Sequence, residues 1–194
     1  WQRCVWVWGR VLRLFMKNFD NCTMNAGSTE DLIYRRGGIN DIQQLKNLGV
    51  ISYGQYVPLL TPDNREKLYS FLYDDKGWQD LISLAVSFVC VDEDTIVGMA
   101  YLIPQGHPTD IYPADWCYIR MVGVHPHYKG KGIARKLTSM CIQKARELNE
   151  KIIGLHTSEF MDAARHIYES LGFTIVKEIP PRYGKKYWLY KLAL

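Results

Sequence analysis

The sequence has no pair of cysteines at the spacing that a metal site or a redox centre requires. Its five cysteines are dispersed along 194 residues. They are Cys4, Cys22, Cys90, Cys117 and Cys141, with no CxxC pair among them. A dispersed, odd-numbered set in a chain of this length is typical of reduced thiols in a cytoplasmic protein, and not of a disulfide framework or a zinc module. We therefore expect no metal ion and a cytoplasmic location.

The chain also lacks a long apolar run and, over most of its length, an excess of positive charge. No run approaches the roughly 18 residues that span a bilayer, so we expect no membrane segment. The formal charge is +4, from 24 basic and 20 acidic residues. Residues 1–23 hold four of the basic residues and one of the acidic residues, which leaves 20 and 19 for the rest of the chain. This nearly neutral body predicts no nucleic-acid partner.

Residues 1–23 differ in composition from the rest of the chain. Three of the six tryptophans fall within the first eight residues, and the four basic residues share one face at helical spacing. This pattern suits a cationic targeting or membrane-surface helix, whereas an upstream read-through or an expression leader, with the natural chain opening at Met24, is the plainer interpretation. No repeat, linker or low-complexity tract interrupts the remainder, so we expect residues 24–194 to form one domain.

Hydrophobic periodicity predicts a mixed α/β domain. Helices are predicted at 38–49, 61–75, 77–85, 133–148 and 161–172. Strands are predicted at 31–37, 116–124, 151–157, 173–179 and 186–194, with a hairpin at 86–103. In the first helix we expect Asn40 as the N-cap and Gly49 as the terminator. The order of these elements predicts one sheet flanked by helices.

Two glycines lie between the strand 116–124 and the helix that follows it, in the stretch HYKGKGIARKL at 127–137. The first turn of a helix leaves backbone N–H groups unpaired and carries a partial positive charge, and glycines keep side chains away from those groups. Such a turn binds phosphates, and Lys129, Lys131 and Arg135 would add positive charge. A tight turn with solvated lysines explains a lone GxG equally well. The chain has neither GxxxxGKS/T nor GxGxxG, which excludes a P-loop and a dinucleotide fingerprint.

The same stretch resembles the Q/R-x-x-G-x-G/A motif of the GNAT superfamily of N-acetyltransferases, which bind acetyl-CoA. YIRMVGVHP, at 118–126, is similar to the strand and turn before that motif, and AARHIYESLGF, at 163–173, to the family's C-terminal helix. These matches stand in the family's order and cover about residues 84–178. The resemblance implies a GNAT-like single twisted mixed sheet in which two strands splay apart to bind acetyl-CoA. One departure is His127, where the motif has Gln or Arg.

The resemblance also implies which residues hold acetyl-CoA. The loop amides would bind its pyrophosphate, and the strand backbone would pair with pantetheine and present one amide to the thioester oxygen. The implied residues are Met121, Val122, Gly123, Val124, Lys129, Gly130, Lys131, Gly132, Ile133 and Ala134. Within the strand, Gly123 marks the expected bulge or a close backbone approach. Met161 stands where the family often has a helix-start asparagine, which removes one contact to CoA common in the family.

Tyr168 is the residue to which the resemblance assigns catalysis. Its implied role is the general acid that protonates the departing CoA thiolate. The other interpretation is an aromatic at the edge of the core, beside an apolar helix face formed by Phe160, Ala164, Ile167 and Leu171, with its hydroxyl in water.

The general base of the family has no obvious counterpart in this chain. Several members carry Glu or His at the positions of Tyr118 and Arg120, and neither of these is an obvious base. Asp115, His156 and Glu159 are alternatives, as is a chain of water molecules. We expect Tyr118 and Arg120 to contact the acceptor instead, and to select a polar or acidic feature on it.

These observations together predict a single-domain N-acetyltransferase that moves an acetyl group from acetyl-CoA to a primary amine. The acceptor, a small molecule or a peptide, is not identified by the sequence. The alternative is a catalytically degenerate module that binds or senses CoA. The sequence leaves a homodimer open.

Overall fold

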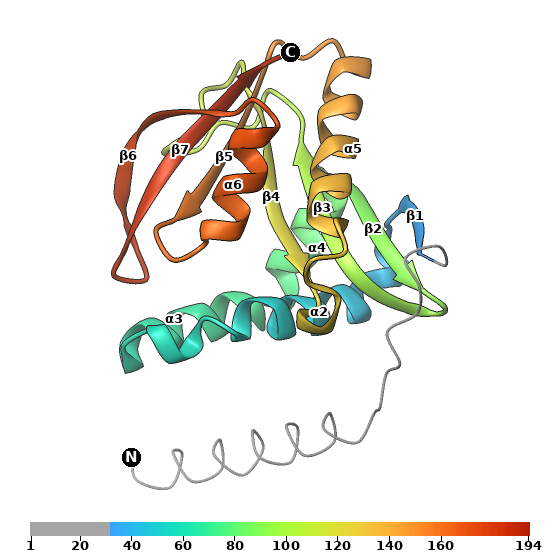
Figure 1. The fold of residues 1–194 in the computed structure, drawn as a ribbon, viewed down its shortest axis with the longest axis vertical. Helices are drawn as coiled ribbons and strands as arrows, with labels where there is room; N and C mark the ends of the chain where they lie inside the picture. Colours follow the sequence, from blue (N-terminus) through green and yellow to red (C-terminus); the bar gives the residue numbers. More distant parts are fainter. Residues whose placement is uncertain (1–31) are drawn as a thin grey trace, which may run out of the picture.

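The computed structural model describes residues 32–194, and the segment 1–23 lies outside them. Seven strands form one sheet in the order β1-β2-β3-β4-β5-β7-β6 (Figure 1). They are β1 (Ile33–Arg36), β2 (Val86–Asp92), β3 (Thr95–Ile103), β4 (Cys117–Val124), β5 (Ile152–Ser158), β6 (Thr174–Arg182) and β7 (Lys185–Ala193). In this sheet β4 and β5 are parallel, and every other neighbouring pair is antiparallel. The prediction of a single mixed sheet is confirmed.

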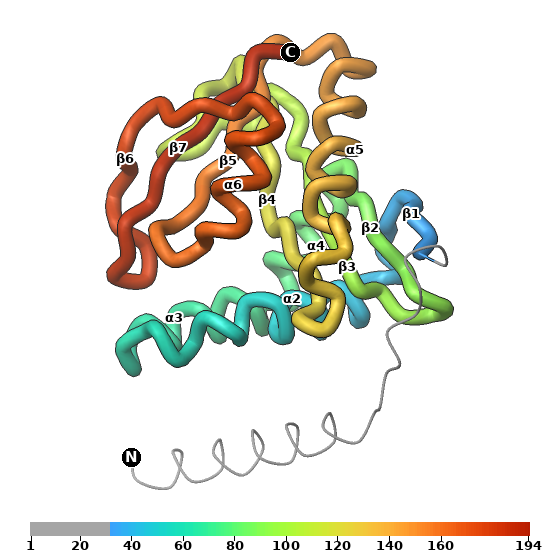
Figure 2. Tube along the Cα trace, viewed as in Figure 1, coloured from blue at the N-terminus to red at the C-terminus, as the bar shows by residue number. Residues whose placement is uncertain are grey.

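Helices cover both faces of this sheet (Figures 1 and 2). They are α2 (Ile42–Gly54), α3 (Pro62–Leu72), α4 (Asp75–Leu84), α5 (Ile133–Glu147) and α6 (Asp162–Ser170). Residues of α2, α3 and α4 pack into one core, and residues of α5 and α6 pack into a second. Among residues 32–194, no helix is long and apolar enough to cross a membrane.

Strand β3 separates the two cores. Met99 and Tyr101 pack with α2 and α4, whereas Ala100 and Leu102 pack with α5. Side chains alternate between the faces of a strand, so a strand buried on both faces appears in sequence as a continuous apolar run. This explains why the hairpin at 86–103 could be predicted from the sequence.

The first predicted helix is longer than expected because Gly49 does not end it. A 3₁₀ turn at Ile39–Asp41 leads into α2, which continues five residues past Gly49. A Cβ atom built on Gly49 would lie 2.7 Å from Cζ2 of Trp78. The glycine therefore allows α4 to pack closely against the middle of α2, and our prediction of a terminator there was wrong. Asn40 lies within the 3₁₀ turn, so the prediction that it caps the helix was wrong as well.

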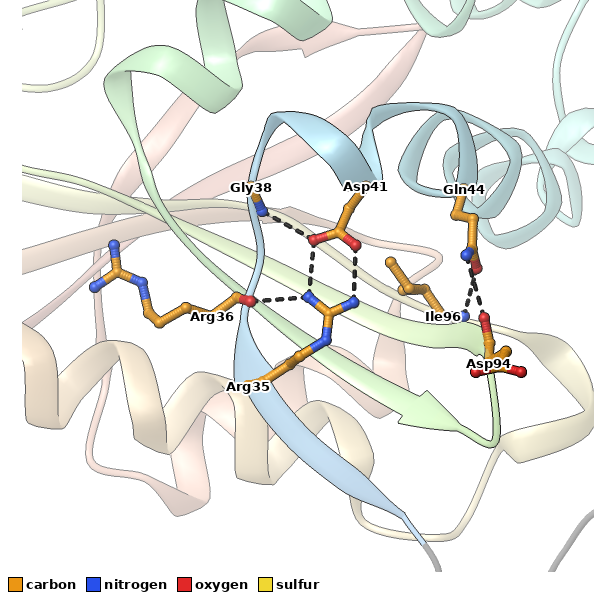
Figure 3. Close-up of polar contacts among 7 residues, drawn as sticks. All are labelled: Arg35, Arg36, Gly38, Asp41, Gln44, Asp94 and Ile96. Atoms are coloured by element: carbon orange, nitrogen blue, oxygen red, sulfur yellow. Dashed lines mark hydrogen bonds and ion pairs between the residues drawn. The ribbon is translucent and has the colours of Figure 1, made fainter.

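Polar contacts fix the beginning of α2 to the edge of the sheet (Figure 3). Both terminal nitrogens of Arg35, in β1, donate to the carboxylate of Asp41 at 2.8 Å. This guanidinium holds the pKa of Asp41 below its ordinary value. One turn later, the side chain of Gln44 accepts a hydrogen bond from the backbone of Ile96 at 2.8 Å and donates one to the carbonyl of Asp94. The other end of α2 is thereby directed toward β4.

Strand β4 has a bulge at Met121 and Val122. Gly123 pairs with Met99 and Arg120 pairs with Tyr101, so two residues of β4 lie opposite the single residue between those partners. Met121 has a φ of +53°. This left-handed conformation is uncommon for a residue with a side chain and is typical of such irregularities.

Gly123 itself lies in regular pairing, so the bulge expected there is formed instead by the two residues before it. A Cβ atom at this position would lie 2.7 Å from Oγ of Ser52 and 2.9 Å from Cε of Met99. The close approach of α2 to the sheet therefore requires this glycine. The bulge and the close approach are separate features of neighbouring residues.

Strands β4 and β5 pair only at their beginnings and then diverge (Figure 1). The pairs are Cys117 with Ile153 and Tyr118 with Gly154. Beyond them, the edge of β4 that faces β5 has no strand partner. The backbone groups on that edge are available to something other than a strand.

Candidate active site

A cavity of about 900 Å³ lies where β4 and β5 diverge. Its wall includes the C-terminal end of α2, the bulged part of β4, the glycine loop, β5, α6 and the turn between β6 and β7. It falls within the usual range for small-molecule sites, about 300–1,000 Å³. Segments far apart in the chain meet here because the splayed strands leave a gap that no side chain of the sheet fills.

The glycine loop forms one end of this cavity. Gly130 and Gly132 have φ values of +79° and +77°, a region that other residues rarely adopt. A Cβ atom on either would meet nothing within 4 Å, so the space beside both is open. Gly132 is the N-cap of α5, and the first backbone bond of the helix runs from Lys136 to its carbonyl at 3.0 Å.

The amides at the start of α5 are free for a ligand. No backbone acceptor among residues 32–194 pairs with the N–H groups of Gly132, Ile133 or Ala134. All three residues line the cavity. Unpaired amides at the positive end of a 15-residue helix, with open space in front of them, are suited to a phosphate.

The basic residues around the loop have different surroundings. Lys129 lines the cavity and donates to the side chain of Gln55, at the end of α2. Arg135 also lines it and donates to Oγ of Ser170 at 2.5 Å, which ties α5 to α6. Lys131 is not part of the wall; its ammonium lies 5.1 Å from the ring centre of Tyr128.

The bulged part of β4 forms the floor of the cavity. All four residues that the resemblance implied there, from Met121 to Val124, line it. The hydroxyl of Tyr53, in α2, donates to the carbonyl of Val122 at 3.4 Å. The loop amides and the free edge of β4 therefore belong to one continuous surface.

Tyr168 lies inside the same cavity and is more buried than expected. Only 7% of its surface is exposed, and it is the buried residue of α6, whereas Ala164 and Ile167 are partly exposed. Burial raises the pKa of its phenol, with a further contribution from Tyr56. The hydroxyl therefore keeps its proton at neutral pH, which is the form that a general acid requires. The alternative interpretation, an aromatic at the edge of the core with its hydroxyl in water, implied a more exposed side chain than this.

His156 is the one candidate base from the sequence that lies in the cavity wall. It belongs to β5, and its Nδ1 is 2.7 Å from the hydroxyl of Tyr112, a residue of the loop between β3 and β4. Burial, together with the nearby charges of Arg182 and Arg120, lowers the pKa of His156 to about 3. The ring is thus neutral at physiological pH and a weak base. Asp115 and Glu159, also considered as bases, are exposed and do not line the cavity.

The structure separates the two residues expected to contact the acceptor. Arg120 lines the cavity, whereas Tyr118 does not. The ring of Tyr118 stacks on Tyr112 at 4.0 Å, and its hydroxyl donates to the carbonyl of His107 at 3.1 Å. Tyr118 therefore supports Tyr112, and Tyr112 in turn contacts His156.

Sequence reasoning missed the contribution of the last hairpin. Arg182, Tyr183 and Tyr187 all line the cavity. The aromatic residues of the final 14 positions signalled only a strand, and no local pattern marked Arg182. These side chains reach the site because β7 lies beside β5, which is a property of the strand order.

The acetyltransferase (GNAT) family model matches residues 55–173 of this chain. The chain belongs to the GNAT family of acetyltransferases. The matched region runs from the residue after α2 to the third residue after α6, and it contains the glycine loop, the bulged strand and Tyr168.

Two curated GNAT relatives are similar over part of their length. L-amino acid N-acyltransferase MnaT of Escherichia coli is 36% identical over 70 residues, which are 35% of this chain and 40% of that protein. N-alpha-acetyltransferase 30 of Schizosaccharomyces pombe is 31% identical over 111 residues, 57% of this chain and 69% of that protein. The chain thus spans well under half of the first relative and about two thirds of the second.

Among solved structures, the chain is similar to the PaiA N-acetyltransferase of Thermoplasma acidophilum in complex with coenzyme A. The TM-score is 0.66, with 84% of this chain and 99% of that chain covered. The identity is 13%, so the likeness is one of fold. It agrees with the GNAT sheet and helices described above.

Proposed function

We propose that the chain is an N-acetyltransferase that moves an acetyl group from acetyl-CoA to a primary amine. One observation carries the proposal: the free amides at the start of α5 and the unpaired edge of β4 line a single cavity that also holds Tyr168. The family membership and the CoA complex of the PaiA relative support the same ligand.

The residues present suit CoA. Gly130 and Gly132 leave open space in front of the helix amides, and Lys129 and Arg135 add positive charge beside it. These groups would hold the pyrophosphate. The free edge of β4, from Met121 to Val124, would take the pantetheine arm, because that arm has amide groups of its own.

Acetyl-CoA supplies the acetyl group as a thioester, which a neutral amine attacks through its nitrogen. A bond from carbon to nitrogen forms and the bond from carbon to sulfur breaks. Tyr168 holds a proton and gives it to the departing sulfur, and solvent then restores the proton to the phenol. The proton lost by the amine goes to water, and within residues 32–194 Asp162, at the start of α6, is the carboxylate of the cavity wall.

The test is a pair of measurements on the whole chain. Calorimetry with acetyl-CoA measures binding, and release of free CoA thiol across a panel of amines measures turnover. Binding with turnover supports the enzyme. Binding without turnover on any amine would favour the degenerate CoA-binding module, and absence of binding would reject both.

We propose a cytoplasmic protein, supported by Cys90, Cys117 and Cys141, which are buried and unpaired. The acceptor is proposed as a small-molecule or peptide amine, in line with the amino-acid and N-alpha relatives. A homodimer stays a prediction that gel filtration with light scattering would test.

A further inference from the structure

We propose that Arg120, His156 and Arg182 form an anion-binding subsite that selects an acceptor amine carrying a carboxylate. This inference rests on the proposed acetyl transfer and names the class of its acceptor. The three residues line the same cavity as the glycine loop. They come from three different strands, β4, β5 and β6.

Arg120 supplies the first observation. Its side chain is partly buried in the cavity wall, and no carboxylate or hydrogen-bond acceptor of residues 32–194 pairs with it. A guanidinium is charged at every physiological pH and presents five N–H donors. A partly buried guanidinium that no carboxylate of the described residues neutralises is suited to an anion that arrives with the ligand.

Arg182 supplies the second observation. It lies at the end of β6 and pairs with Asp110 at 3.3 Å. The Asp110 side chain is 71% exposed, and an exposed pair of this kind contributes little, about 0–1 kcal/mol. The guanidinium can therefore leave Asp110 for a better-placed carboxylate inside the cavity.

The two arginines act on the same part of the cavity. Burial lowers the pKa of His156, and Arg182 and Arg120 both lower it further. Burial raises the pKa of Tyr183, and the same two arginines oppose that rise. Arg120, His156, Arg182 and Tyr183 all line this one cavity, and the positive charge of both guanidinium groups acts on the His156 and Tyr183 side chains.

His156 contributes a donor to this subsite and not a second charge. The hydroxyl of Tyr112, whose proton is retained because burial raises its pKa, lies 2.7 Å from Nδ1 of His156, and in this proposal it donates to that nitrogen. The neutral ring then carries its own proton on Nε2, on the side away from Tyr112. A neutral donor between two guanidinium groups fits the oxygen atoms of a carboxylate.

The charges around the cavity support an anionic acceptor and argue against a polycationic one. Within residues 32–194, Asp162 is the sole carboxylate in the wall, and it belongs to α6. An amine with additional positive charges would meet Arg120 and Arg182 without a compensating anion. An amine with a nearby carboxylate would be held by them.

The test uses matched acceptors that differ only in the carboxylate. Free amino acids are compared with their amides and their decarboxylated amines, and amidated tripeptides with Glu at the second position are compared with those carrying Gln. Turnover is followed by CoA thiol release. The carboxylate member of a pair should be preferred at least tenfold in kcat/KM, mainly through KM. The amino-acid and peptide arms distinguish an α-carboxylate from an acidic side chain.

Variants tie that preference to the subsite. Arg120→Gln and Arg182→Gln should each reduce it at least tenfold and leave acetyl-CoA affinity unchanged, and Arg120→Lys should restore part of it. Arg146→Gln, at an exposed position in the last turn of α5, is the matched control and should change nothing. Equal or better turnover of the neutral members, or a preference that survives both glutamine variants, would overturn the inference.

Binding measurements test the subsite if no acetyl transfer is seen. If acetyl-CoA binds but no amine turns over, the same acceptor pairs are titrated into the protein loaded with acetyl-CoA. If acetyl-CoA does not bind, the pairs are titrated into the free protein. Carboxylate binding that Arg120→Gln abolishes supports the subsite even where acetyl transfer fails. Absence of carboxylate binding in these titrations rejects the subsite, whereas loss of acetyl-CoA binding alone rejects only the proposed function.

Discussion

The hydroxyl of Tyr112 lies 2.7 Å from Nδ1 of His156, and so connects a loop residue to a ring in the cavity wall. Tyr112 is itself held by stacking on Tyr118, with the two rings 8° from parallel. The loop between β3 and β4 therefore determines how a side chain of β5 is oriented toward the cavity.

Tyr112→Phe should weaken acceptor binding and leave CoA binding intact. The ring and its stacking stay, but Nδ1 of His156 loses its hydroxyl partner, which in our proposal selects the tautomer, so we expect KM for the best acceptor to rise several-fold. Tyr118→Phe is the matched control, because it removes a hydroxyl that contacts only the carbonyl of His107. NMR of labelled histidine reads the tautomer directly; the same tautomer in both variants would contradict this role for Tyr112.

Gly130→Asp and Gly132→Asp should each weaken acetyl-CoA binding at least tenfold in calorimetry. A carboxylate would enter the open space in front of the α5 amides, where a phosphate is expected. A side chain at a left-handed position also costs about 1–2 kcal/mol of stability. Gly106→Asp controls for that cost, since Gly106 has a φ of +90° and open space around it but does not line the cavity. Loss of acetyl-CoA affinity in all three variants, or in none of them, would contradict the proposal that this loop binds the pyrophosphate.

Tyr168→Phe should affect the chemical step and not binding. It removes only the hydroxyl, and general acid catalysis is worth roughly 10²–10⁴ in rate. We expect kcat to fall by that order when chemistry limits turnover, with acetyl-CoA affinity nearly unchanged. Tyr190→Phe is the control. Tyr190 lies in β7, and its hydroxyl donates to Glu169 of α6 at 2.9 Å, outside the cavity. Wild-type turnover by Tyr168→Phe would leave only a packing role.

The depressed pKa of His156 should make the protein less stable in mild acid. Its folded pKa is about 3, below the value of about 6.5 expected when unfolded, so between these values the unfolded chain binds a proton that the folded chain does not. The stability contributed by the neutral ring is present above pH 6.5 and falls with pH, by about 1–2 kcal/mol between pH 7.5 and 5. Urea unfolding at both values should show a smaller loss in His156→Gln. An identical loss would mean that His156 titrates normally.

Gly49→Ala should destabilise the protein, although alanine favours helices. Its Cβ would lie 2.7 Å from Trp78, and overpacking of this kind costs about 1–3 kcal/mol. Gly54→Ala is the matched control at the end of the same helix, where a Cβ meets nothing within 4 Å, and it should be neutral or stabilising by about 0.4–1 kcal/mol. Chemical denaturation compares the two; equal stability would show that α4 can move away.

Local patterns in the sequence were enough to predict the elements and the loop at one end of the site. The periodicity of apolar residues predicted the helices and strands, because burial repeats along each element by itself. The glycine loop could be predicted from the sequence for the same reason, because left-handed backbone and free helix amides are properties of a few consecutive residues. The position of Tyr168 followed from its motif, although its degree of burial did not.

Contacts between distant segments decided the rest. Gly49 and Gly123 are glycines because α4 and α2 approach them, and neither approach is visible in the neighbouring residues. The bulge lies at Met121 because β3 and β4 must shift register there. Arg120 and Arg182 lie 62 positions apart in the chain, and they share a cavity only because β7 pairs with β5 and carries β6 with it. A subsite made by three strands depends on their order in the sheet, which is a property of the folded chain and not of any one segment.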